Sequence, residues 1–325
     1  MRRFLLPAVV TAAILGPVVG LGDVLNIDNG VVGAGHLDVN VDEFGSYGNF
    51  SAAHVDNFQP TGAASGQPTF TAGFRLFSGQ DRVILSDIPL WNAPPWGGAT
   101  WTRAPIFFGQ NNASTVTSVF RVNNAAGASM LGFNLTQVAS AGGPGVGILD
   151  QTYEIFNISG SPLAFQMNRV LDADLMWDGD FANDQVAASN GLDWVIQHDS
   201  PTQAMAMTAG PGAPNTFYWG GKNTVVPGGG PPAYGFGTDI IVWNNFGLPT
   251  SWENHIAHVG YNTPGSSGPV PVQDGHIGLD WRLSLAAGQM TTLTVRTVYG
   301  DSVPEPATLL ALGTGLIVLI RRRRR

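Results

Sequence analysis

The chain has 325 residues, 44% apolar and only 12% charged, and its 43 glycines, 22 prolines and 9 tryptophans exclude a helical bundle, a coiled coil and a disordered polypeptide. The formal net charge is −8 although seven arginines lie at the two ends, so the acidic body between them disfavours nucleic-acid binding. The absence of cysteine excludes disulfides, thiolate metal sites and a cysteine nucleophile.

Residues 1–22 predict a signal peptide that directs export. Arg2 and Arg3 form its positive end, Phe4–Val19 forms its apolar segment, and the small residues that follow offer a cleavage site. An uncleaved anchor helix is the alternative, which Pro17 and the other helix-breaking residues of the apolar segment disfavour.

Residues 23–302 predict one all-β domain, a large antiparallel β-sandwich. Several segments alternate apolar and polar residues with period two or are rich in β-branched and aromatic residues, as strands are. No long period of 3.6 residues occurs between the termini. Gly- and Pro-rich stretches predict loops, among them 139–147, and 157–162 predicts a hairpin loop. The predicted strands are 116–122, 131–138, 153–158, 163–170, 193–197, 216–219, 240–243, 279–285 and 291–299.

Two stretches of this body resemble known large bacterial sandwiches. Residues 153–187 (YEIFNISGSPLAFQMNRVLDADLMWDGDFANDQVA) resemble the strand–loop–strand core of such domains, and 285–294 (LAAGQMTTLT) resembles their last strand. Related sandwiches occur in galactose mutarotase-like and β-galactosidase domains. The resemblance implies a supersandwich-like fold and transfers no catalytic residue.

Three tryptophans spaced five residues apart suggest a carbohydrate-binding surface. Trp91, Trp96 and Trp101 lie in a Gly- and Pro-rich run that favours exposure, and flat indole faces pair well with sugar rings. The alternative is that these indoles cover one end of the hydrophobic core, since tryptophan is highly buried on average.

Five aspartates within thirteen residues suggest a calcium site. Ca²⁺ takes six to eight oxygen ligands, several of them carboxylates, from an adaptable loop. The spacing does not match an EF-hand, and a solvated acidic loop with Asx turns is the alternative. Calcium is the only cofactor that the sequence suggests, and its predicted ligands are Asp172, Asp174, Asp178, Asp180 and Asp184.

The C-terminus reads VPEPATLLALGTGLIVLIRRRRR, in which an apolar run from Ala307 to Ile320 precedes five arginines. Fourteen helical residues span about 21 Å, short of a hydrocarbon core of roughly 30 Å, but a short helix inserts when the bilayer thins around it. Arginines hold their end of such a helix in the cytoplasm. Residues 303–325 therefore predict a transmembrane anchor.

This tail resembles the PEP-CTERM sorting signal, which is also labelled an ice-binding protein C-terminal domain. The Pro-Glu-Pro triplet, the short helix and the arginine cluster occur in the order of that signal at the end of the chain. The resemblance implies that an exosortase, a membrane enzyme, recognises Pro304, Glu305 and Pro306 and cuts nearby. It also implies a link to exopolysaccharide and biofilm.

Together these features predict an exported, non-enzymatic structural or binding protein of the cell surface or matrix. The tail would first anchor it in the inner membrane and then be processed, and polysaccharide would be a partner in the matrix. The alternative is a secreted carbohydrate-active hydrolase or lyase on a β-sandwich, which the tryptophans, the aspartates and the resemblance to sugar-related sandwiches support, with no catalytic residue named. Two carboxylates about 5–10 Å apart across a groove would favour that alternative.

Overall fold

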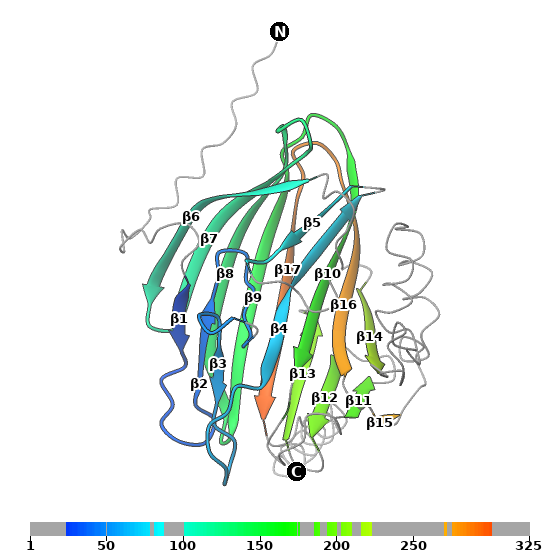
Figure 1. Ribbon diagram of the computed structural model, residues 1–325. Helices are drawn as coiled ribbons and strands as arrows, with labels where there is room; N and C mark the ends of the chain where they lie inside the picture. Colours follow the sequence, from blue (N-terminus) through cyan, green and yellow to red (C-terminus); the bar gives the residue numbers. More distant parts are fainter. Residues whose placement is uncertain are drawn as a thin grey trace, which may run out of the picture.

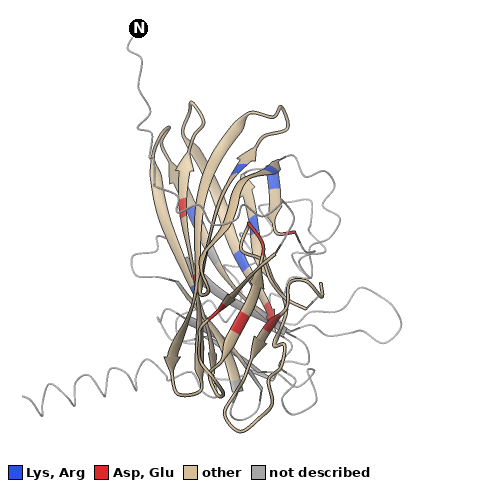
Figure 2. Ribbon diagram, turned by 90° about the vertical axis from the view of Figure 1, so that its left-hand side faces the viewer, with Lys and Arg blue, Asp and Glu red and all other residues tan. Residues whose placement is uncertain are grey.

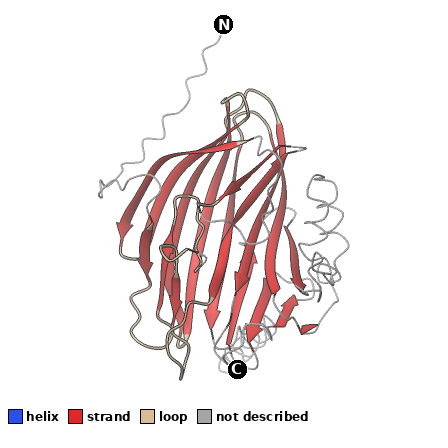
Figure 3. Cartoon of the chain, viewed as in Figure 1, coloured by secondary structure: helices blue, strands red, loops and turns tan. Residues whose placement is uncertain are grey.

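The computed structural model describes residues 24–49, 51–78, 81–87, 101–173, 175, 185–188, 194–199, 203–209, 216–222, 270–271 and 275–300. These residues form antiparallel strands, turns and connecting segments, as Figure 3 shows. Among them no helix is long and apolar enough to cross a membrane. The predicted signal peptide (1–22) and sorting tail (303–325) lie outside the described residues.

The larger layer is a nine-stranded sheet in which each pair of neighbours is antiparallel. Its middle strands alternate buried and partly exposed residues, because one face points to the core and the other points outward. In spatial order the strands are β15 (Val270–Pro271), β11 (Gln185–Ala188), β12 (Trp194–Asp199), β13 (Gln203–Ala209), β17 (Met290–Gly300), β9 (Val146–Asn157), β8 (Ser129–Gly143), β7 (Thr115–Asn123) and β6 (Thr102–Asn112).

Two smaller sheets lie side by side over one face of the larger one (Figure 1). An isolated bridge pairs Tyr47, which lies between residues 41 and 56, with Ala72 of the five-stranded sheet, and Thr69 of that sheet donates hydrogen bonds to Asp56 of the three-stranded sheet. The five-stranded sheet has the order β14 (Thr216–Lys222), β16 (Gly275–Leu285), β10 (Leu163–Ala173), β4 (Thr69–Ser78) and β5 (Asp81–Leu85). The three-stranded sheet has the order β1 (Leu25–Asp28), β2 (Leu37–Val41) and β3 (Asp56–Phe58).

One hydrophobic core fills the space between these two layers, as in a β-sandwich. Phe74 of β4 contacts rings from both layers, with centroids 4.6 Å from Tyr153 of β9 and 6.2 Å from Trp281 of β16. Each large apolar side chain buried in this way stabilises the fold by about 1.5–3 kcal/mol. Charged residues are sparse on the described strands (Figure 2), consistent with the low charge of the whole chain.

The loop at 157–162 crosses between layers, so its prediction as a hairpin loop is wrong. It leaves β9 in the nine-stranded sheet and enters β10 in the five-stranded sheet. Asn, Gly, Ser and Pro mark a reversal of the chain, but they do not determine which sheet the next strand joins. The segment 286–289, which leads from β16 to β17, crosses back beside it.

Asn157 ties these two crossings together. Its backbone N–H donates to the Gln289 carbonyl at 2.9 Å, and its carbonyl accepts from Gly288 N–H at 2.8 Å. Its side-chain Nδ2 donates to the carbonyls of Leu285 (2.8 Å) and Ser161 (2.9 Å). One fully buried asparagine therefore satisfies backbone groups from both connections.

We expect Asn157→Ala to lower the free energy of unfolding by about 2–3 kcal/mol in urea titrations, because buried carbonyls lose their donors. The matched control is Asn124→Ala, which removes bonds to Ala126 and Ala128 N–H groups in an exposed turn. Water replaces those bonds, so the control is expected to lose less than about 1 kcal/mol. Equal losses in the two variants would contradict the role given to Asn157.

The described strands confirm the all-β prediction. The predicted strand at 240–243 lies outside the described residues. The predicted loop at 139–147 is wrong, because β8 and β9 continue through most of it and leave only a tight turn at 144–145. Gly143 (φ 130°) and Gly145 (φ 70°) supply the positive dihedral angles of that turn.

Candidate functional site

A polar turn is buried between the two layers. Residues 42–46 follow β2 into the interior, and all five residues are buried. Side chains from β8, β9 and β10 supply donors to the carbonyl groups of the turn, which explains why the inner faces of these strands carry polar residues. The bonds run from Gln137 to the Asp42 carbonyl (3.1 Å), from Tyr153 to Phe44 (3.0 Å), and from Gln151 (2.7 Å) and Arg169 (3.2 Å) to Gly45.

The Asp42 carboxylate organises the turn from within. It accepts the N–H groups of Phe44 (2.9 Å) and Ser46 (2.8 Å), the Ser46 hydroxyl, and the N–H of Asp87 (2.7 Å), which lies two residues after β5. Burial raises the pKa of Asp42 above its usual range, whereas these four donors favour its charged form.

Glu43 and Asp87 form a pair of carboxyl groups at the edge of this turn. The Glu43 side chain is 2% exposed, and the Asp87 carboxyl is one of the acidic groups that act on it. Burial, followed by the nearby Asp87 and Asp42 charges, raises the pKa of Glu43 to about 7. Arg103 of β6 forms an ion pair with Asp87 at 3.0 Å, and its guanidinium lies 4.5 Å from the Phe44 ring centroid.

His54 completes this buried group as a neutral base. It is 7% exposed, and neither ring nitrogen has a hydrogen-bond partner in the described part of the chain. Burial lowers its pKa, although the charges of Asp42 and Asp87 act in the opposite direction. The group can therefore hold or release a proton near neutral pH, but its acid and base are sealed from bulk solvent.

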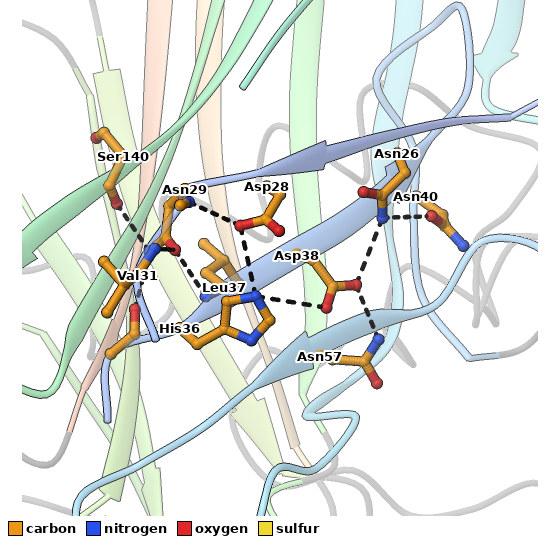
Figure 4. Close-up of polar contacts among 12 residues, drawn as sticks. Asn26, Asp28, Asn29, Val31, His36, Leu37, Asp38, Asn40, Asn57 and Ser140 are labelled. Carbon is orange, nitrogen blue, oxygen red and sulfur yellow. Dashed lines mark hydrogen bonds and ion pairs between the residues drawn. The ribbon is translucent and has the colours of Figure 1, made fainter. Parts of the chain in front are cut away.

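A second polar cluster covers the outer face of the three-stranded sheet (Figure 4). Asp28 lies opposite Asp38 in the β1–β2 register, and His36 Nε2 lies 3.4 Å from Asp28 and 4.0 Å from Asp38. Two side-chain amides donate hydrogen bonds to Asp38 Oδ1: Asn57 Nδ2 at 2.9 Å and Asn26 Nδ2 at 3.4 Å. These accessible donors and acceptors suit hydrogen bonding to a polar partner.

The sequence analysis predicts neither the buried turn 42–46 nor the polar cluster around Asp38, although the strand that carries Asp38 has a recognisable pattern. Leu37, Val39 and Val41 alternate with polar residues over five positions, which is the pattern of a strand with one polar face. The buried turn has no such signal, because Asp42–Ser46 reads as an ordinary exposed turn.

Of the predicted calcium ligands, only Asp172 lies among the described residues. It is 2% exposed on β10, opposite Thr71 of β4 and His276 of β16. Among the described residues no group of three or more acidic or histidine side chains is arranged to hold a metal ion. Arg169, the arginine nearest the acidic run in sequence, is buried and bonds to Gly45 instead. The calcium site stays a prediction.

The three tryptophans of the predicted carbohydrate surface differ in what the structure describes. Trp101 is 2% exposed and belongs to the hydrophobic core, so its indole covers the core rather than facing a ligand. Burial of a large apolar ring outweighs the exposure that its Gly- and Pro-rich flank predicted. Trp91 and Trp96 lie outside the described residues, and their carbohydrate contact stays a prediction.

Comparison with known families identifies the C-terminal end. A model of the PEP-CTERM protein-sorting motif matches residues 302–325, which include Pro304, Glu305 and Pro306. The resemblance of the tail is thereby confirmed. No curated protein matches the chain.

Among solved structures the chain is similar to a galactose mutarotase-like protein and to a bacterial glucoamylase. A galactose mutarotase-like protein from Lactobacillus casei ATCC 334 has 9% identity and a TM-score of 0.38, over 85% of this chain and 99% of its own. A bacterial glucoamylase complexed with acarbose has 10% identity and a TM-score of 0.43, over 90% of this chain and 37% of its own. Likenesses at this level carry no argument about activity.

Proposed function

We propose that this protein is exported and sorted to the cell surface through its C-terminal tail, where its β-layered body is a structural or binding component of an exopolysaccharide matrix. The observation that carries the proposal is the sorting motif at residues 302–325. An exosortase-type enzyme is the processing partner that this motif implies. The inner membrane holds the precursor through the apolar run before the arginines.

The described residues favour a structural or binding role over catalysis. The carboxyl groups with raised pKa values (Asp42, Glu43 and Asp56) and the histidine with a lowered pKa (His54) are buried and beyond the reach of a polymer. The accessible polar cluster around Asp38 lies on a sheet face and is largely engaged in its own hydrogen bonds. Such a face suits many weak contacts along a polymer better than a reaction at one bond.

Deletion of residues 303–325 is expected to release the body as soluble protein, because it removes both the apolar run and the arginines. The measurement is fractionation of cells into membrane and soluble material, with detection of an epitope placed in the exposed turn at 124–128.

Replacement of Pro304, Glu305 and Pro306 by alanine keeps the apolar run, so it is expected to leave an uncut, membrane-bound precursor.

Two outcomes would contradict the proposal. Membrane association of the truncated protein would show that the tail is not the anchor. Normal processing and release of the triple-alanine variant would show that the Pro-Glu-Pro triplet is not the recognition element. As the matched control, Ser302→Ala alters the residue before the apolar tail and leaves the triplet intact, so it is expected to be processed normally.

A further inference from the structure

Four threonines form one row across the outer face of the nine-stranded sheet, the face that points away from the hydrophobic core. They lie on adjacent strands in direct register, and each is partly exposed: Thr294 on β17, Thr152 on β9, Thr136 on β8 and Thr117 on β7. The Oγ1 atoms of Thr152 and Thr294 lie 3.1 Å apart. Because neighbouring strands are about 4.8 Å apart, this threonine row presents hydroxyl groups at a regular spacing over about 14 Å.

An aromatic ring lies at the end of the threonine row. Gly109 of β6 is the residue opposite Thr117, and a Cβ added to Gly109 would lie 2.7 Å from Cζ of Phe107. The Phe107 ring therefore occupies the place of the missing side chain and continues the line of hydroxyl groups. Phe107 is partly exposed, whereas Phe108 is buried in the core, so the two rings lie on opposite faces of the sheet. The register shift between Pro105 and Phe107 marks a bulge, which re-aims the side chains beside it.

The charges on this face balance. The four strands that carry the threonine row contain two acidic and two basic residues, although the whole chain has a net charge of −8. Arg296 donates two hydrogen bonds of 2.8 Å to the Asp150 carboxylate. Glu154 accepts from Asn134 at 3.0 Å, and Arg121 is exposed. A face without net charge attracts neither a polyanion nor a polycation and suits an uncharged partner.

Hydroxyl groups and an aromatic ring together recognise sugars. The ring packs against the C–H face of a sugar, and the hydroxyl groups exchange hydrogen bonds with those of the sugar. The spacing of the strands is also comparable to the length of one sugar unit in an extended chain.

We propose that the outer face of the nine-stranded sheet binds an uncharged polysaccharide, which lies along the threonine row and stacks on Phe107. The inference rests on the proposed matrix role, and it adds the class of polymer and the face that contacts it. This face lies on the other side of the sandwich from the polar cluster around Asp38 (Figure 1). Each contact is weak, so retention in a matrix depends on many copies acting together.

Affinity electrophoresis of the full chain, in a detergent without sugar groups, tests this proposal. The gels contain dextran, galactomannan or hydroxyethyl cellulose as uncharged polysaccharides, or alginate as an anionic one. At least one uncharged polysaccharide is expected to retard the protein, and alginate is not. Phe107→Ala is expected to lower the affinity by about fivefold or more, because aromatic anchors dominate such contacts. Phe107→Tyr retains the ring and is expected to bind as the wild type does.

Three further variants separate the position of the ring from its presence. Gly109→Ala removes no polar or aromatic group, but its methyl group meets Phe107 Cζ, so it is expected to displace the ring and weaken binding. Thr136→Val removes one hydroxyl group at the centre of the row and is expected to weaken binding about two- to threefold. Phe156→Ala is the matched control, because Phe156 is a partly exposed ring on the same face but opposite Gly132, outside the row. It is expected to bind as the wild type does.

Absence of retardation by all three uncharged polysaccharides would overturn the proposal, as would retardation by alginate that is at least as strong. Unchanged binding in Phe107→Ala and Gly109→Ala, or an equal loss in Phe156→Ala, would overturn the place given to the ligand. If Phe107→Ala fails to fold, Gly109→Ala and Thr136→Val carry the test. Loss of the proposal in these gels leaves the sorting of the protein intact if its tail is processed normally. An unprocessed tail on a protein that binds polysaccharide would instead contradict the proposed sorting alone.

Discussion

Gly45→Ala is expected to unfold the protein or to destabilise it by more than about 4 kcal/mol, among the largest effects of a single methyl group. Gly45 has a φ of 92°, a region that side chains with a Cβ rarely adopt. A Cβ at this position would lie 2.2 Å from the Tyr153 hydroxyl and 2.9 Å from Gln151 Nε2. Both groups bond to carbonyls of the turn, so neither can move without leaving a buried acceptor unpaired.

Chemical denaturation of two further variants separates the clash from the dihedral strain. Gly127→Ala is the matched control, since Gly127 has a φ of 80° but no atom within 4 Å of its added Cβ, and it is expected to cost about 1–2 kcal/mol. Tyr153→Phe removes the hydroxyl that the new methyl would meet. Adding Gly45→Ala to Tyr153→Phe is therefore expected to cost less than in the wild type. Equal costs in Gly45→Ala and Gly127→Ala would contradict the close packing of the turn.

The sequence predicts the nine-stranded sheet best where one face of a strand is apolar. In β17, Leu293, Val295 and Tyr299 are buried and Arg296 is exposed, as their alternation predicts. β4 gives no such signal because almost all of its residues are buried, so apolar and polar residues do not alternate along it. β6 contains Pro105, which argues against a strand from sequence alone but is accommodated at a sheet edge beside a register shift.

The buried turn lies beyond what sequence patterns predict, for a physical reason. Gln137 and Gln151 occupy inward positions on β8 and β9 that alternation would fill with apolar residues. They are stable there because the turn inserted from residues 42–46 presents carbonyl groups for them to bind. The donors and acceptors come from distant segments of the chain: Asp42 and Gln137 are 95 residues apart in the sequence. No local window contains both partners.

We expect the free energy of unfolding to fall as the pH rises from 4 to 8, with Asp56 as a main cause. This carboxyl is fully buried on β3, and burial raises its pKa from 3.8 to about 7, although the backbone N–H and the hydroxyl of Thr69 donate to it. A raised folded-state pKa gives stability that is complete below the unfolded pKa of about 4 and is lost as the pH rises through 7. At about 1.4 kcal/mol per pKa unit, the loss from this residue is on the order of 4 kcal/mol.

Asp56→Asn removes the titrating group and is expected to flatten this pH dependence, measured by urea titration at intervals from pH 4 to pH 8. Asn57→Ala, the adjacent residue on β3, loses a bond to Asp38 and is expected to lower stability equally at every pH without changing the slope. Thr69→Val is the third variant. It removes a donor to the Asp56 carboxylate, so it is expected to raise the pKa of Asp56 further and to extend the fall in the free energy of unfolding to higher pH. An unchanged slope in Asp56→Asn would show that this carboxyl does not titrate between the folded and unfolded states in that range. Neither Asp56 nor Glu43 is among the groups that shift the pKa of the other, so the slope changes of Asp56→Asn and Glu43→Gln are expected to add in the double variant.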